Sequence, residues 1–159
     1  MAEAYQPPPT GTSPLLGVVG CGVMGRGIAQ IAAAAGTRVR MVDSRPDAAG
    51  AAVAELRQTF ARLAEKGKMS AEQAQAAGTR IEACAGLEAL AGCEVVVEAI
   101  VEDLDAKKAL FARLEQVLDE RTILASNTSS LSVTAIAAGL RHPERVAGFH
   151  FFNPVPLMK

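Results

Sequence analysis

Residues 15–43 read LLGVVGCGVMGRGIAQIAAAAGTRVRMVD. They begin with a short apolar run, 15–20, which predicts a buried strand. An alanine-rich stretch follows and ends near Gly36, a residue type that commonly terminates helices. Residues 37–43 (TRVRMVD) predict another strand, with Val39 and Met41 on one face. The order indicates a β-α-β unit, whose two strands are parallel because a helical crossover separates them.

The turn between the first strand and the helix carries Gly20, Gly22 and Gly25 in the pattern G-x-G-x-x-G. In a dinucleotide site the first glycine makes the tight turn, the second lets the backbone approach the pyrophosphate, and the third lets the helix press on the strand. The helix N-terminus supplies N–H donors to the phosphates. Val23 and Met24 lie inside the turn, so we expect them beside the cofactor. The alternative is a tight turn whose glycines serve packing only.

Asp43 ends the second predicted strand about 20 residues after the turn, where an acidic residue binds ribose hydroxyls. Its charge would repel a 2′-phosphate, which favours NAD over NADP. Arg45 complicates this inference, because an arginine just beyond the second strand can hold a 2′-phosphate. We predict NAD as the cofactor, since Asp43 occupies the discriminating position itself.

The remainder of the chain continues to alternate apolar runs with amphipathic stretches. Residues 46–78 combine apolar positions at helical spacing, a break at Gly67 and a capping-box sequence at 70–73, which predict a helical hairpin. We expect strands at 80–83, 94–100, 122–126 and 146–151, and helices at 103–118 and 132–138. The predicted fold is α/β, a Rossmann-type doubly wound, mostly parallel sheet with a helical hairpin inserted after the second strand.

The 159 residues are 50% hydrophobic and 21% charged, with a formal net charge of -1. This composition is typical of one globular domain, and no block of like charge indicates a nucleic-acid or membrane partner. Three cysteines without a C-x-x-C pair favour neither a disulfide framework nor a metal site. We expect a disordered proline-rich lead-in over 1–14 and a folded domain over 15–159. No apolar run is long enough to span a bilayer, so we expect a cytoplasmic protein.

Polar residues that core packing does not explain gather in the second half of the chain. They are Glu98, Glu102, Lys107, the run SNTSS at 126–130, and His150. In a doubly wound sheet the ligand crevice lies outside the carboxyl ends of the strands. Most of these residues follow predicted strand ends, so we expect them to converge on that crevice. Histidine is the side chain best suited to take a proton near neutral pH.

Four segments together resemble a known family. They are GCGVMGRGIAQIAAAAG at 20–36, VVVEAIVEDLDAKKALFARLE at 95–115, SNTSSLSVTAIA at 126–137 and PERVAGFHFFNPVPLMK at 143–159. They resemble the NAD-binding domain of L-3-hydroxyacyl-CoA dehydrogenases, with the bacterial 3-hydroxybutyryl-CoA and 3-hydroxyadipyl-CoA enzymes as the closest type. The resemblance covers residues 15–159. It implies an oxidoreductase that interconverts (S)-3-hydroxyacyl-CoA and 3-ketoacyl-CoA with NAD, in fatty-acid or related acyl-CoA metabolism.

The same resemblance implies roles for individual residues. His150 corresponds to the catalytic histidine, which takes the proton of the substrate's 3-hydroxyl as hydride leaves C3 for the nicotinamide. Ser129 corresponds to the serine that binds this hydroxyl, and Asn153 helps to shape the same site. Glu102 and Lys107 correspond to a glutamate and a lysine near the nicotinamide end of the cofactor.

Lys66 and Lys68, at the tip of the predicted hairpin, resemble positions that contact the coenzyme A moiety, although hairpin tips are also commonly lysine-rich for solubility. Family members continue beyond the segment that ends at 159 into a strand whose glutamate orients the histidine. An all-helical domain with most of the dimer interface follows. The resemblance thus implies that these 159 residues alone bind NAD but turn over poorly, and that the full-length enzyme is a homodimer.

Alternatives stay open for these residues. A non-catalytic dinucleotide-binding sensor or partner module would need only the glycine turn and Asp43. The run 126–130 could merely cap the short helix that follows it, and Lys107 on a helix face could simply be solvated. His150 between two phenylalanines on a strand could be structural. Another family of β-hydroxyacid dehydrogenases would rely on a catalytic lysine in a later helix, and it lacks the SNTSS and HFFNPVP segments.

Overall fold

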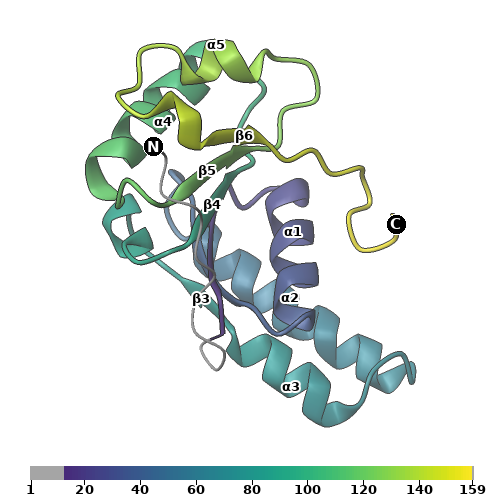
Figure 1. Cartoon of the computed structure of the whole chain (residues 1–159). Coiled ribbons are helices and arrows are strands. Elements are labelled where there is room, and N and C mark those ends of the chain that lie inside the picture. The colour runs from purple at the N-terminus through teal and green to yellow at the C-terminus, as the bar shows by residue number, and fades with distance from the viewer. Residues whose placement is uncertain (1–12, 159) are drawn as a thin grey trace.

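Six parallel strands form the centre of the structure, a computed structural model that describes residues 13–158. Across the sheet the strands lie in the order β3-β2-β1-β4-β5-β6 (Figure 1). Their bounds are Leu15–Val19 for β1, Arg38–Val42 for β2, Ile81–Ala83 for β3, Val95–Glu98 for β4, Ile123–Ser126 for β5 and Val146–Gly148 for β6. The predicted doubly wound parallel sheet is confirmed.

Helices cover both faces of this sheet. Their bounds are Val23–Ala34 for α1, Ala48–Glu65 for α2, Ala71–Thr79 for α3, Leu104–Val117 for α4 and Val133–Ala137 for α5, with short 3-10 helices at Leu87–Leu90 (η1) and Pro143–Arg145 (η2). The predicted hairpin is α2 and α3, which project together from the sheet (Figure 1). Within residues 13–158, no helix combines the length and apolar character needed to cross a membrane.

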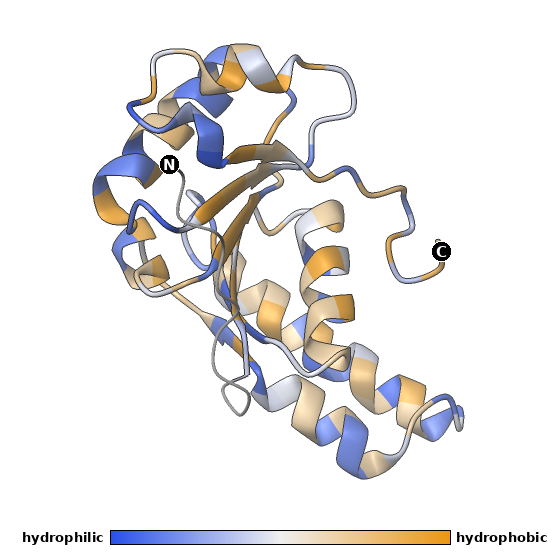
Figure 2. Ribbon diagram, in the orientation of Figure 1, coloured by the Kyte–Doolittle hydropathy of each residue, from blue (hydrophilic) through white to orange (hydrophobic). Residues whose placement is uncertain are grey.

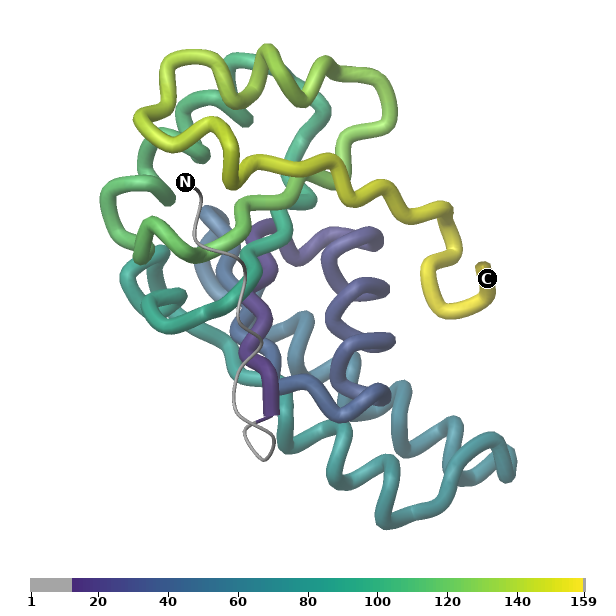
Figure 3. The backbone as a smooth tube through the Cα atoms, in the orientation of Figure 1, coloured from purple at the N-terminus to yellow at the C-terminus, as the bar shows by residue number. Residues whose placement is uncertain are grey.

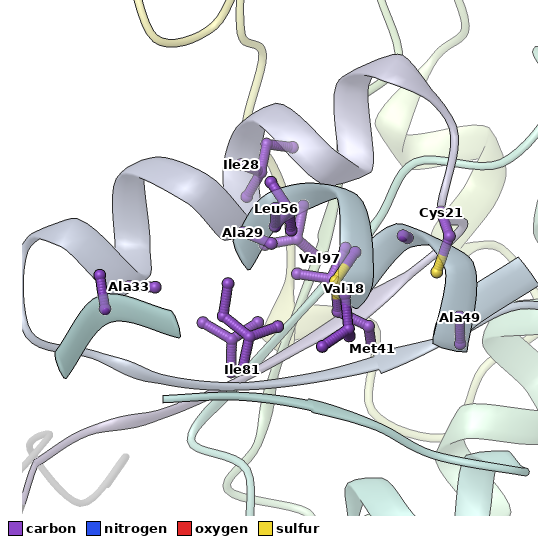
Figure 4. Close-up of a cluster of buried hydrophobic side chains, with 14 of the residues drawn as sticks. Val18, Cys21, Ile28, Ala29, Ala33, Met41, Ala49, Leu56, Ile81 and Val97 are labelled. Atoms are coloured by element: carbon purple, nitrogen blue, oxygen red, sulfur yellow. The ribbon is translucent and has the colours of Figure 1, made fainter. Parts of the chain in front are cut away.

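Alternate residues of the strands contribute their side chains to two hydrophobic cores, one on each face of the sheet. Val97 and Ala125 pack with α1, α2 and α3, while their neighbours Val96 and Leu124 pack with α4 and α5. Figure 4 shows part of the first core, where Ile28 of α1 lies over the sheet. The central strands are accordingly hydrophobic throughout, as Figure 2 shows, because both of their faces are buried.

The strand order reverses direction between β1 and β4. From β1 the chain proceeds outward to β2 and β3, then returns to β4 on the other side of β1. In this class of sheet the ligand crevice lies at that point, outside the carboxyl ends of the strands. The register aligns Val19, Glu98 and Ser126, the last residues of β1, β4 and β5, at this edge. The glycine turn and the polar residues of the second half therefore meet there.

Local sequence signals place most element ends correctly. Gly36 has φ +100 just after α1, and Gly67 has φ +66 between the hairpin helices, as expected for helix-terminating glycines. The capping box at the start of α3 is formed: Ser70 accepts from Gln73 N at 3.2 Å, and Gln73 accepts from Ser70 N at 2.8 Å. The proline-rich lead-in predicted for 1–14 falls mostly on residues 1–12, which lie outside the described residues.

The strand predicted over 146–151 is wrong beyond Gly148, where β6 ends. Its neighbour β5 stops at Ser126, so pairing ends with the bond from Phe149 N to Ser126 O. Phe151 N then donates to the Asn127 side chain rather than to a strand. His150 consequently lies on an irregular segment and not on a strand.

Beyond β6 the chain runs across to α1 (Figure 3). Val155 is buried in the first core, where it packs on α1 at Gly27. A Cβ at Gly27 would lie 2.8 Å from Val155 Cβ, closer than real contacts allow. The missing side chain at Gly27 thus lets the segment that follows His150 lie directly on α1.

Replacing Ser70 by alanine removes the hydroxyl that caps α3, and we expect the free energy of unfolding to fall by about 1 kcal/mol. Ser70→Gly should lose only about a few tenths of a kcal/mol, because glycine is itself a tolerated N-cap residue. Urea unfolding followed by circular dichroism measures both. Equal losses in the two variants would contradict the capping role.

Candidate functional site

The three glycines of the turn, Gly20, Gly22 and Gly25, differ in what surrounds the position of a Cβ atom. Gly20 has φ +99, and a Cβ there would lie 2.5 Å from Ala99 O. A Cβ at Gly25 would lie 1.8 Å from Gly20 O. Around Gly22, in contrast, a Cβ would meet nothing within 4 Å. Gly20 is thus required by its positive φ and by the close approach of the backbone that follows β4, and Gly25 by the close approach of α1 to the turn after β1. Packing gives no reason for Gly22. A ligand that approaches the backbone at Gly22 would supply one.

The N-terminus of α1 is open toward this side. Gly22 is its N-cap residue, no side chain caps it, and no acidic residue lies in its first turn. The first backbone bond of the helix is from Arg26 N to Gly22 O. The N–H groups of the first turn and the helix dipole are therefore available to an anion, and a pyrophosphate fits that position.

A cavity of about 780 Å³ lies at the carboxyl ends of β1, β2 and β4. Its wall includes Gly20, Gly22, Asp43, Ile100 and Arg113 of α4. Clefts of this volume are typical of small-molecule and cofactor sites. This cavity thus coincides with the crevice that the strand order predicts.

Asp43 lies in the wall of this cavity, and its carboxylate has several donors. Oδ2 accepts from Cys21 N at 2.7 Å, and Oδ1 accepts from Arg45 N at 2.9 Å. The Arg45 guanidinium also donates to both oxygens, at 3.0 and 3.1 Å. The hydrogen bonds from Arg45, ahead of the one from Cys21, lower the pKa of Asp43 to about 2 although burial opposes this. Asp43, which favours NAD, and Arg45, which could favour NADP, are therefore joined in an ion pair.

Glu98 is the most buried carboxylate at the crevice, with a side chain that is 0% exposed. Its Oε1 accepts from Lys107 Nζ at 2.6 Å and from Ile100 N at 2.7 Å. Its Oε2 accepts from Ser126 Oγ, also at 2.6 Å. Lys107 is only 1% exposed, so the interpretation of a solvated lysine on a helix face is wrong.

Glu102 connects this buried pair to the SNTSS loop. Its Oε2 lies 3.2 Å from Lys107 Nζ, and its Oε1 accepts from Thr128 Oγ1 and from the N–H groups of Ser129 and Ser130, at 3.0 and 3.3 Å. Burial raises the pKa of Glu102, but these donors, Thr128 foremost, outweigh it and lower the pKa to about 2. The predicted convergence of Glu102, Lys107 and Ser129 is therefore observed.

The loop does not cap the helix that follows it. Ser132 caps α5, accepting from Ala135 N at 3.2 Å, and the capping interpretation of 126–130 is wrong. The Ser129 side chain is exposed, and its hydroxyl makes no hydrogen bond within residues 13–158. A hydroxyl in this position is available to a ligand.

His150 lies beside this loop, because its two neighbours in the chain are bonded to it: Phe149 N donates to Ser126 O, and Phe151 N donates to the Asn127 side chain. Its side chain is exposed, and its ring packs edge-on against Phe152 with centroids 4.8 Å apart. No hydrogen bond to the His150 ring is formed in the described part of the chain. An exposed imidazole without a hydrogen bond to the described residues argues against a purely structural histidine.

Three other predicted residues do not join this cluster. Asn153 is exposed and lines a separate cavity of about 170 Å³ between the C-terminal segment, α1 and α2. Lys66 and Lys68 are exposed on the loop between α2 and α3, at the opposite end of the molecule from α5 (Figure 1). The structure thus places them apart from the crevice.

Sequence reasoning missed two contributions to the site. It gave no role to Glu98 or to Cys21, whereas Cys21 N donates a hydrogen bond to Asp43. Burial raises the pKa of the Cys21 thiol to about 11, with the Asp43 charge adding to it, which favours the protonated thiol near neutral pH. A glutamate inside the apolar run EVVVEAI, followed nine residues later by a lysine on a helical stripe, was the available signal for Glu98.

Residues 15–159 match the family model described as "3-hydroxyacyl-CoA dehydrogenase, NAD binding domain". The chain belongs to this family. It is 48% identical over 142 residues to a probable 3-hydroxybutyryl-CoA dehydrogenase of Bacillus subtilis, which covers 89% of this chain and 50% of that protein. It is 44% identical to 3-hydroxyadipyl-CoA dehydrogenase of Escherichia coli, over 89% of this chain and 30% of that protein.

Solved structures of this dehydrogenase family agree. The crystal structure of 3-hydroxybutyryl-CoA dehydrogenase from Escherichia coli superposes with a TM-score of 0.89 at 42% identity, covering 93% of this chain and 31% of that one. The enzyme PaaH1 from Ralstonia eutropha gives 0.87 at 37% identity, over 92% of this chain and 52% of that one. The chain therefore spans about half the length, or less, of the relatives it matches. The uncapped N-terminus of α1 and the free space around Gly22 fit the NAD that the family binds.

The contrast between Gly22 and Gly25 predicts opposite outcomes for one added methyl group. Gly22→Ala should leave the free energy of unfolding within about 0.5 kcal/mol, because its Cβ meets no protein atom. It should weaken NADH binding about ten- to a hundredfold, the effect of overpacking a close contact by about 1–3 kcal/mol. Fluorescence titration and thermal unfolding measure the two effects.

Gly25→Ala is the matched control, since its Cβ would collide with Gly20 O and should destabilise the fold itself. If Gly22→Ala bound NADH as well as the parent chain does, the pyrophosphate would not lie against this turn.

The lowered pKa of Glu102 predicts an acid dependence of stability. The folded state holds the carboxylate ionised, so its contribution is complete above the ordinary value of 4.5 and is lost as the pH falls toward 2. Glu102→Gln should therefore flatten the loss of stability over this range. Urea unfolding at a series of pH values checks it, with Glu65→Gln on the exposed end of α2 as the control. An unchanged acid profile in Glu102→Gln would refute the assignment.

Proposed function

We propose that this chain is the cofactor-binding part of an NAD-dependent enzyme that interconverts (S)-3-hydroxyacyl-CoA and 3-ketoacyl-CoA. The observation that carries the proposal is the convergence of the open glycine turn, the Glu102–Lys107 pair and the exposed Ser129 and His150 at one edge of the sheet. The names of the relatives support the substrate class, since they are dehydrogenases of 3-hydroxyacyl-CoA thioesters. A sensor module would have no use for Ser129 and His150.

The adenosine half of NAD occupies the end of the crevice at Asp43, and the nicotinamide half lies toward the SNTSS loop. Asp43 accepts the ribose hydroxyls, and its negative charge disfavours a 2′-phosphate. NAD supplies the hydride acceptor when bound. The Glu102 carboxylate and Ser129 border the nicotinamide half, while Lys107 acts from beneath by holding Glu102.

In the direction of alcohol oxidation, an unprotonated ring nitrogen of His150 takes the proton of the substrate's 3-hydroxyl. Ser129 Oγ holds the oxygen of that hydroxyl, and Asn153 shapes the substrate side of the site. In the reverse direction the protonated imidazole returns the proton to the carbonyl oxygen. Lys66 and Lys68 attract the phosphates of coenzyme A. The homodimeric assembly and the cytoplasmic location expected from the sequence stay predictions.

Parallel titrations with NADH and NADPH test the cofactor. We expect saturable NADH binding and an NADPH affinity that is weaker by about tenfold or more. The reason is that a 2′-phosphate replaces a ribose hydroxyl that would donate to the Asp43 carboxylate, and the two negative charges repel each other. Arg45→Ala should widen the difference, since it removes the cation that offsets the Asp43 charge. Tighter binding of NADPH than of NADH would contradict the role of Asp43.

Turnover tests the catalytic assignment. No described carboxylate orients His150, so the 159-residue polypeptide should bind NADH but reduce a 3-ketoacyl-CoA about 10⁴-fold more slowly than the Bacillus subtilis relative, by analogy with triads that lack their orienting acid. His150→Asn should abolish the residual rate and leave NADH affinity unchanged. A rate equal to that of the relative, or one that survives His150→Asn, would overturn the proposed role.

A further inference from the structure

A closed ring of hydrogen bonds and ion pairs joins five residues beneath the SNTSS loop: Glu98, Lys107, Glu102, Thr128 and Ser126. Lys107 Nζ lies 2.6 Å from Glu98 and 3.2 Å from Glu102, and Glu102 accepts from the Thr128 hydroxyl. The Thr128 N–H donates to Ser126 Oγ at 3.3 Å, and Ser126 Oγ donates to Glu98 at 2.6 Å, which closes the ring. The ring connects the ends of β4 and β5 with α4.

Glu98 is the fixed point of this ring. It is the last residue of β4, in register with Val19 and Ser126, and its side chain is 0% exposed. Both of its carboxylate oxygens are engaged, one by Lys107 and Ile100 N and the other by Ser126. A group so buried contacts no ligand in the crevice, so any effect on binding passes through its neighbours.

Lys107 transmits the position of Glu98 to the loop. Its ammonium lies between two carboxylates, one buried and one, Glu102, 40% exposed. Removing the charge of one partner in a buried ion pair leaves the other charge uncompensated, which is costly. Lys107 would then have only Glu102 as its counter-charge, and Glu102 is the group that holds the N–H groups of Ser129 and Ser130.

We propose that Glu98 is a positioning residue for the nicotinamide half of the cofactor site, where it fixes Lys107 and Glu102 and thereby the backbone at Ser129. This inference rests on the proposed function, which places the nicotinamide beside that loop. The adenosine half contacts the glycine turn and Asp43, neither of which belongs to the ring. Glu98 should therefore affect the two halves of the dinucleotide unequally.

The test compares NADH with ADP, which occupies only the adenosine half, on the 159-residue chain and its Glu98→Gln variant. We expect the NADH dissociation constant to rise about tenfold, the effect of losing one charge-assisted hydrogen bond, while that of ADP stays within about twofold. Glu115→Gln is the matched control. Glu115 is also a buried carboxylate on α4, but it accepts from Arg141 N and His142 N and stands outside the ring.

A measurement without ligand tests the ring itself. Amide hydrogen exchange at Ser129 and Ser130, followed by NMR, should accelerate about tenfold in Glu98→Gln and stay unchanged in Glu115→Gln. Parallel losses of NADH and ADP affinity would indicate general destabilisation and overturn the inference. So would unchanged NADH affinity or unchanged exchange in Glu98→Gln. Absence of NADH binding by the parent chain would overturn the proposed function, and the positioning role with it.

Discussion

The site depends on how closely α1 approaches the end of β1. A Cβ at Gly25 would lie 1.8 Å from Gly20 O, so only a residue without a side chain lets the helix begin directly on the turn. This approach directs the N–H groups of the first helical turn toward the edge of the sheet at which the strand order reverses, between β1 and β4. The same edge carries the ends of the strands that bring Glu98 and Ser126 into register. The open N-terminus of α1 and the polar ring thus lie at the same edge of the sheet.

Two carboxylates of the site, Asp43 in the cavity wall and Glu102 beside the SNTSS loop, lie in different environments. Asp43 is paired with Arg45, whose side chain is 68% exposed, so solvent and salt screen this pair. Glu102 is paired with Lys107, which is 1% exposed and shares Glu98 as a second counter-charge. The end at Asp43 is therefore open to adjustment, whereas the end at the SNTSS loop is held by buried groups with few alternative partners. Under the proposed function the nicotinamide lies at the SNTSS loop, where a rigid site favours precise alignment for hydride transfer.

Signals that act over a few residues predicted most of the fold. The glycine spacing, the Ser70–Gln73 capping box and the alternation of apolar runs each report a local backbone requirement, and each corresponds to an observed element. The strand predicted to run to 151 failed because its end is set by the neighbouring strand β5, which stops at Ser126. A strand boundary of that kind depends on pairing between distant segments, which one run of sequence does not record.

The site was predictable to a similar degree. The residues that follow strand ends were expected to converge, and Glu102 and Ser129 do, with Lys107 of α4 paired to Glu102. The burial of Lys107 was not foreseen, although it stands three residues before Leu110 in the stripe that faces the core. A lysine in that stripe needs a buried counter-charge, and Glu98 at the end of β4 provides it. The pairing required knowledge of which strand lies beneath α4.

The central claim is that one dinucleotide spans the crevice from the glycine turn to the SNTSS loop. NMR titration of the isotope-labelled chain with NAD⁺ tests it most directly, because each backbone N–H reports separately. The account predicts shifts at residues 21–24 and at 128–130, with the tip of the α2–α3 hairpin unaffected. Shifts confined to the hairpin, or absent from either end of the crevice, would contradict it.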